Sequence, residues 1–330
     1  MIFDWNPAGI AVALSWAFSV SFETLPAVLI ALLAFSSHSI PAGILLLFAI
    51  EVLAFMGMCR GTRRNLHAAS MKWFILVFLG CFVALFGAAL GEIPAGRGML
   101  VSGLLLMVPN GITNFIFGGF FEKQTPRSFT GSVLIPAFVA IDLLLKARSG
   151  AKAEFGVVFE AALQALGALT LIHSALLAYL RQRIKAVMIH GSLAWVGAAL
   201  LFGPFDSDPS APVVLSAFAV LSVSLIPFLG LSAQLGPGFF SFARVAVLGL
   251  PGSIGFAAVF FALKESLAAS PAAIGALFAG QLLMIMALIS CRTWEVADPG
   301  RSVKVRFWIV TAVQWISGCG ICWYGLGGMR

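Results

Sequence analysis

Charged side chains are scarce in this sequence: they make up 10% of its 330 residues, whereas apolar residues make up 61%. A soluble protein of this length needs a far more polar surface, so the composition excludes that class. Many apolar runs are long enough to cross a bilayer as helices, and they do not alternate polar and apolar residues as barrel strands do. The composition is therefore typical of an all-α polytopic membrane protein.

Signatures of catalysis are absent as well. The glycine-rich segments GLGGM and GLPGSIGF neither follow a strand nor open a soluble helix, so they are not phosphate-binding loops, and no Ser-His-Asp arrangement occurs. The CxxC formed by Cys319 and Cys322 lies in an apolar run without a second pair, so we interpret both as packing residues. We expect no catalytic residue, metal or cofactor in this chain, apart from bound lipid, although it could belong to an oxidoreductase complex.

The apolar runs predict about eleven transmembrane helices. The first run, 7–35, is too long for one upright span and too short for two, so we expect one tilted or kinked helix with an interfacial N-terminal piece, two short helices being the alternative. The start of the chain lacks the basic region of a signal peptide, so we expect it to be retained. The other spans are predicted at 41–58, 73–90, 103–121, 129–145, 155–180, 186–202, 212–228, 244–267, 271–290 and 307–324.

Two of these spans carry helix-breaking residues in the middle. Pro109, Asn110 and Gly111 interrupt the span 103–121, and Pro251 and Gly252 interrupt 244–267. Two broken helices in corresponding positions of two halves indicate a transporter fold built from inverted repeats. Neither break has an ionisable residue beside it.

Basic residues gather in alternate loops. The loops 59–72, 122–128, 181–185 and 292–306 hold most of the lysines and arginines, so the positive-inside rule predicts that they are cytoplasmic, in a bacterial inner membrane. The net charge of +7 is explained by this orientation signal, and we expect no nucleic-acid partner. No loop is long enough to form a soluble domain for a nucleotide or an electron carrier.

Residues 45–90, 166–202 and 248–267 together resemble the antiporter-like membrane subunits of respiratory complex I and the Mrp-type cation/proton antiporters. The resemblance covers the chain from about residue 41 onward, with shortened N-terminal helices. It implies two inverted five-helix repeats, each with one broken helix, in a subunit of a larger complex. We divide the chain into a kinked segment 1–36, repeats 37–150 and 151–291, and a basic loop with a final helix at 292–330.

In that family a row of buried charges across the middle of the membrane is thought to carry protons. The resemblance implies that Glu51 retains one of these charges and that Lys72 matches a lysine common at the start of the next helix. Three lysine positions correspond instead to Met107, Val139 and Val259, and a histidine position to Trp195. An apolar side chain neither binds a proton nor holds water, so these replacements predict a degenerate channel.

The remaining ionisable residues within spans admit two interpretations each. Glu51 is either a functional residue, as a proton acceptor or an ion-pair partner of Lys72, or a protonated, hydrogen-bonded residue without function. Asp142 lies four residues before Lys146, which favours a simple ion pair at the membrane interface. His173 and His190 lie on consecutive helices at similar depth, so they could bind haem, although most such histidines only satisfy hydrogen bonds.

Three functions follow from these observations. The first is an accessory or structural membrane subunit of a larger complex that does not pump protons, with other membrane subunits and lipids as partners. The alternative is a working proton- or cation-translocating subunit that uses Glu51, Lys72, Lys264 and Asp142. A third, electron transfer through a haem at His173 and His190, needs both imidazoles to face one cavity.

Overall fold

The computed structural model describes residues 25–61, 64–91, 93–149, 156–202, 211–269, 271–291 and 301–327. In this part of the chain nine helices are long and apolar enough to cross a membrane. The short apolar helix α2 and the broken pair α12 and α13 bring the membrane segments to eleven. The predicted all-α polytopic fold is confirmed. Most of the segment 1–36, expected to be kinked, lies outside the described residues.

The helices begin and end close to the apolar runs. Their bounds are α2 (Leu25–Ser36), α3 (Ile40–Gly61), α4 (Arg64–Leu90), α5 (Pro94–Met107), α6 (Gly111–Lys123), α7 (Pro126–Phe129), the π-helix η1 (Thr130–Leu134), α8 (Ile135–Ser149), α9 (Gly156–Arg181), α10 (Ile184–Phe202), α11 (Ala211–Leu235), α12 (Pro237–Leu248), α13 (Ile254–Ala269), α14 (Pro271–Ser290) and α15 (Arg301–Gly327).

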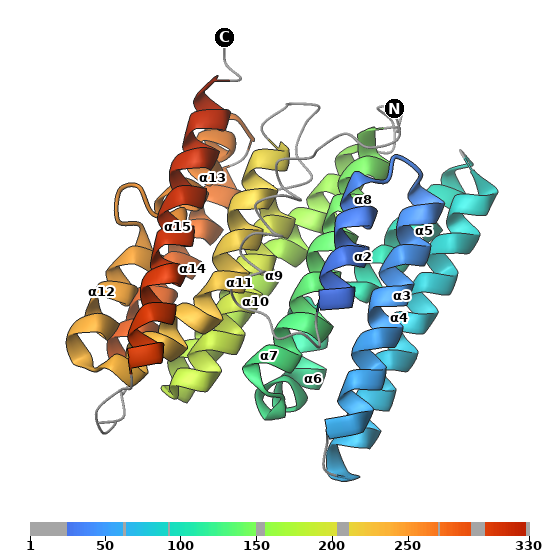
Figure 1. Ribbon diagram of the computed structural model, residues 1–330. Helices are drawn as coiled ribbons and strands as arrows, with labels where there is room; N and C mark the ends of the chain where they lie inside the picture. Colours follow the sequence, from blue (N-terminus) through green and yellow to red (C-terminus); the bar gives the residue numbers. More distant parts are fainter. Residues whose placement is uncertain are drawn as a thin grey trace.

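The helices stand side by side in one bundle (Figure 1). The early helices α2 to α5 form one side of the bundle and the late helices α12 to α15 the other, with α9, α10 and α11 between them (Figure 1). Helix α8 contacts both the early helices α2, α3 and α5 and the central helices α10 and α11. The central helices therefore stand between α3 and α13.

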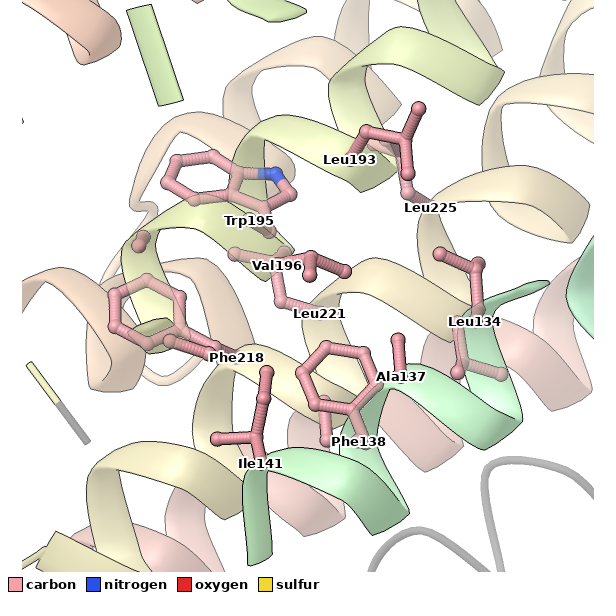
Figure 2. Packing of buried hydrophobic residues seen from close by; sticks show 14 of the residues in the cluster. Leu134, Ala137, Phe138, Ile141, Leu193, Trp195, Val196, Phe218, Leu221 and Leu225 are labelled. Atoms are coloured by element: carbon pink, nitrogen blue, oxygen red, sulfur yellow. The ribbon is translucent and has the colours of Figure 1, made fainter. Parts of the chain in front are cut away.

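The centre of this bundle is apolar. Leu134, Ala137, Phe138 and Ile141 point from η1 and α8 towards side chains of α10 and α11 (Figure 2). Trp195 of α10 stacks on Phe218 of α11, with ring centroids 5.8 Å apart. Almost every described residue of α8 and α10 is buried, which is typical of helices enclosed by protein on all sides.

A proline explains the π-helical turn before α8. Pro136 has no backbone N–H, so it cannot donate to the carbonyl four residues earlier, and its ring crowds that carbonyl. The chain widens just upstream, where the Ile135 N–H bonds instead to the Thr130 carbonyl, five residues back. Within the widened turn, the Ser132 hydroxyl donates to the Ser128 carbonyl at 2.8 Å.

Helices α4 and α5 approach each other at glycines. A β-carbon at Gly80 would lie 2.7 Å from the Gly103 carbonyl, and one at Gly103 would collide with the Ala84 amide. Small residues allow this contact between backbones, which is a common way for membrane helices to associate. The contact holds the first half of the broken span against α4.

Candidate functional site

The three positions that the resemblance relates to relay lysines carry apolar side chains, and two of them are fully buried. Met107 and Val139 are both 0% exposed, and Val259 is partly buried in α13. A β-carbon at Gly80 would lie 2.9 Å from the Met107 Cγ, so the Met107 side chain fills the space beside α4. None of these three side chains offers a polar atom to water or to a proton.

Glu51 is buried in α3 and is only 1% exposed. Its Oε1 has no hydrogen-bond partner, and the Cys81 thiol of α4 lies within electrostatic range. Lys72 lies on an exposed part of α4, and no ion pair joins it to Glu51 within the described residues. The predicted Glu51–Lys72 ion pair does not form: Lys72 is exposed, whereas Glu51 is buried.

Asp142 forms the predicted pair with Lys146 in a different setting. The Lys146 Nζ lies 2.7 Å from the Asp142 Oδ2, and Asp142 is buried in α8. The same ammonium donates to the carbonyls of Ala34 and Phe35, at 3.3 and 2.8 Å. Lys146 therefore caps the C-terminal end of α2, and the pair joins two helices inside the protein where an isolated interfacial pair was expected.

Lys264 lies on α13, on the other side of the bundle from Glu51 (Figure 1). It is partly exposed. Helices α9, α10 and α11 lie between α13 and α3 (Figure 1). The four relay candidates Glu51, Lys72, Asp142 and Lys264 are therefore not brought together in one cluster.

The first break, between α5 and α6, is closed by a single asparagine. The Asn110 Oδ1 accepts from the backbone amides of Ile112 and Thr113, at 3.0 and 3.1 Å, and its Nδ2 donates to the carbonyls of Leu105 and Val108, both at 3.3 Å. Asn110 thus caps the start of α6 and the end of α5 together. The capping box is completed by Thr113, whose hydroxyl accepts from the Asn110 amide at 2.7 Å.

Helix α9 satisfies one more amide at this break. The Gly111 N–H donates to the Thr170 hydroxyl at 2.8 Å, and that hydroxyl donates to the Leu166 carbonyl at 2.6 Å. Non-helical backbone in the middle of a membrane is tolerated only where the protein supplies its hydrogen bonds. Neutral side chains meet this need, so the break persists without a charged residue.

The second break, between α12 and α13, uses a serine and two glycines. The Ser253 hydroxyl donates to the Ala246 carbonyl at 2.8 Å and accepts from the Phe256 amide at 3.3 Å. Gly249 and Gly252 have positive φ angles of 124° and 85°, which glycine adopts without steric cost. The turn packs against α15, where a β-carbon at Gly252 would lie 3.3 Å from the Trp315 Nε1.

Sequence reasoning missed a charged cluster at the end of α6. The Glu122 Oε1 lies 2.8 Å from the His190 Nε2 of α10 and 3.4 Å from the Arg181 Nε of α9. His190 is 0% exposed, whereas the Glu122 side chain is 26% exposed. A periodicity could have identified this cluster, because Asn110, Asn114, Gly118 and Glu122 recur every four residues and thus share one side of α6.

The two candidate haem histidines lie near each other, but His190 is engaged. Its Nε2 faces the Glu122 carboxylate, so this nitrogen is not directed at a shared cavity with His173. His173 is partly exposed on α9, next to the ring of Phe115. Within the described residues no group of three His, Cys, Asp or Glu side chains is placed to hold a metal ion.

The fold is shared with chains of respiratory complexes. A chain of respiratory complex I from Thermus thermophilus with bound aureothin is similar, with a TM-score of 0.71 and 18% identity, over 99% of this chain and 85% of that one. A chain of the same complex with bound NADH is similar with a TM-score of 0.75 and 17% identity, over 96% of this chain and 81% of that one. A chain of the membrane-bound sulfane sulfur reductase, an archaeal respiratory membrane complex, has a TM-score of 0.70 and 15% identity. The similarity covers 94% of this chain and 62% of that one.

These similarities confirm the resemblance in fold that the sequence suggested. No protein-family model and no curated sequence matches the chain. At identities of 15 to 18% the shared property is the fold. The function depends on which side chains this fold carries.

Proposed function

We propose that this chain is an integral membrane subunit of a multi-subunit respiratory complex, in which it has a structural or accessory role and does not carry protons across the membrane. The shared fold supports the first part of the proposal. The second part depends on one observation, the complete burial of Met107 and Val139 at positions where relay lysines would stand.

The packing around these positions argues against a hydrated path. Proton transfer needs titratable groups and the water that they hold, and an apolar cavity stays dry even when it is large enough for water. The contact between η1, α8, α10 and α11 contains aromatic and aliphatic side chains (Figure 2). An isolated lysine at the bilayer centre costs about 2.5 to 3.5 kcal/mol on insertion scales, so a subunit released from pumping gains stability when it loses one.

The element order supports the two predicted repeats. Helices α2, α3, α4, the broken α5–α6 and the α7–α8 segment make five membrane segments, and α9, α10, α11, the broken α12–α13 and α14 make five more. The broken helix is fourth in each series. This order favours a first repeat that starts at α2, upstream of the boundary at residue 37, and leaves α15 as an additional helix. We also propose that the two repeats are inverted relative to each other and that the basic loops are cytoplasmic.

Affinity purification from native membranes tests the proposed subunit role. A tag on the chain, extraction in a mild detergent and mass spectrometry of the co-purifying proteins would identify the partners. We expect stoichiometric recovery of other membrane subunits together with bound lipid. Recovery of the chain as a monomer that is stable and active by itself would contradict the proposal.

A second candidate is a proton- or cation-translocating subunit. The buried Glu51, with its unpartnered Oε1, is the observation that favours it, because unpaired carboxyl groups inside membrane helices often mark ion pathways. Reconstitution of the purified chain or its complex in liposomes distinguishes the two. Ion flux that requires both Glu51 and Lys264 would favour translocation.

A further inference from the structure

One side of α6 carries polar groups from the break to the end of the helix. Asn110 lies at the break, Asn114 one turn later, and Glu122 at the far end, with Gly118 between the last two. The Asn114 Nδ2 donates to the Ser174 hydroxyl of α9 at 2.9 Å. The Glu122 carboxylate meets His190 of α10, so this side of α6 faces both α9 and α10.

Two buried polar atoms on this side have no partner. The Asn114 Oδ1 and the His190 Nδ1 are both without a hydrogen bond, although Asn114 is 1% and His190 0% exposed. Burying an unsatisfied polar atom costs about 1 to 3 kcal/mol, so protein interiors rarely leave two together. A bridging ligand with hydrogen-bond donors would remove both costs.

Gly118 provides the space between these atoms. A β-carbon placed on Gly118 would lie 3.1 Å from the Asn114 Oδ1 and 3.6 Å from the His190 Cε1, the ring carbon between Nδ1 and Nε2. Both unsatisfied residues therefore border the position that a side chain at residue 118 would occupy. The neighbouring Gly119 is exposed, and a β-carbon there would meet no atom within 4 Å.

We propose that Gly118, Asn114 and His190 form a binding pocket for water, which connects His190 with the aqueous phase at the Glu122 end of α6. If the His190 Nε2 carries the proton donated to Glu122, then Nδ1 is an acceptor. The Asn114 Oδ1 is an acceptor as well, so one water molecule satisfies both by donating its two hydrogens. Glu122 and Arg181 are partly exposed, and they give this pocket a polar entrance.

Charged groups surround this entrance. Glu122 faces it from α6, and Arg181, Arg183 and His173 lie near it on or just after α9. Among the other helices that contact α10, the described parts of α11 and α14 contain no ionisable side chain, whereas α8 carries Asp142 and Lys146 and α13 carries Lys264. Glu122 and Arg181 therefore make α6 and α9 a polar approach to His190.

Deuterium exchange at the imidazole C2 position tests this pocket, because the exchange requires both protonation of the ring and access of water. The intact protein, with the partners that co-purify, would be incubated in D2O in lipid nanodiscs, and the histidine peptides would be analysed by mass spectrometry. The exposed His38 provides an internal reference. We expect measurable exchange at His190 in spite of its burial.

Two glycine variants make the test specific. Gly118→Ala fills the pocket and should slow exchange at His190 by roughly tenfold while His38 is unchanged. Gly119→Ala, on the exposed side of the same helix, should leave both rates as they are. A His190 that fails to exchange in the unmodified protein, or equal rates in the two variants, would overturn the proposed pocket and leave the proposed subunit role untouched.

Discussion

At the scale of single residues, polar side chains in this protein mainly join helix ends. Asn110 caps both helices at the first break, and Lys146 caps α2 while it neutralises Asp142. Arg244 has a similar role, because its Nη2 donates to the Cys291 carbonyl just after α14 at 2.8 Å. Each group satisfies backbone atoms that lipid could not.

Replacement of Asn110 by alanine should destabilise the protein. The variant loses the cap of α6 and leaves the carbonyls at the end of α5 without a donor, which together cost about 1 to 3 kcal/mol. Thermal unfolding in detergent would show a lower midpoint. Asn110→Ser keeps an N-cap acceptor and should recover part of the loss, and an unchanged midpoint for Asn110→Ala would contradict the capping role.

The pair of Asp142 and Lys146 predicts a coupled response. Lys146→Met leaves a buried carboxylate without its cation and should cost about 3 kcal/mol, at the low end for a broken buried pair because Lys146 keeps some exposure. The double variant Asp142→Asn with Lys146→Met should be more stable than Lys146→Met alone. Additive effects in thermal unfolding would show that the two residues are independent.

At the scale of elements, the spans and their breaks could be predicted from the sequence because both are local properties. The length of an apolar run predicts a membrane helix, and the Pro-Asn-Gly sequence at 109–111 and the Pro-Gly sequence at 251–252 predict a break within one. Which side of a helix is buried depends on its neighbours, so the exposure of Lys72 could not be predicted from the sequence. The Glu122–His190 contact joins residues that are 68 positions apart, and only the four-residue periodicity of α6 hinted at it.

Two glycine replacements, one at the second break and one in α14, should have opposite effects on stability. Gly252 has a φ of 85° and lies against Trp315, so Gly252→Ala should cost about 1 to 3 kcal/mol through backbone strain. Gly275 lies exposed inside α14 with open space around it, so Gly275→Ala should stabilise by about 0.5 to 1 kcal/mol. Thermal unfolding of both variants checks the prediction, and equal midpoints would contradict it.

At the scale of the whole molecule, the fold and the proposed loss of function are separate matters. The two breaks are held by neutral caps, so the architecture survives without relay charges at its centre. The sequence predicted the architecture from apolar runs and prolines. It could only suggest dry packing at Met107 and Val139, because burial depends on side chains that α4, α10 and α11 bring from elsewhere.

The most direct test of a closed proton route is the Glu51→Gln variant of the intact complex in liposomes. This substitution keeps the shape of the side chain and removes the only group at this relay position that can ionise. The measurement is the number of protons translocated per turnover, with the rate of turnover as the control for assembly. We predict the same number as in the unmodified complex; a smaller number at an unchanged rate would show that protons still pass through this subunit.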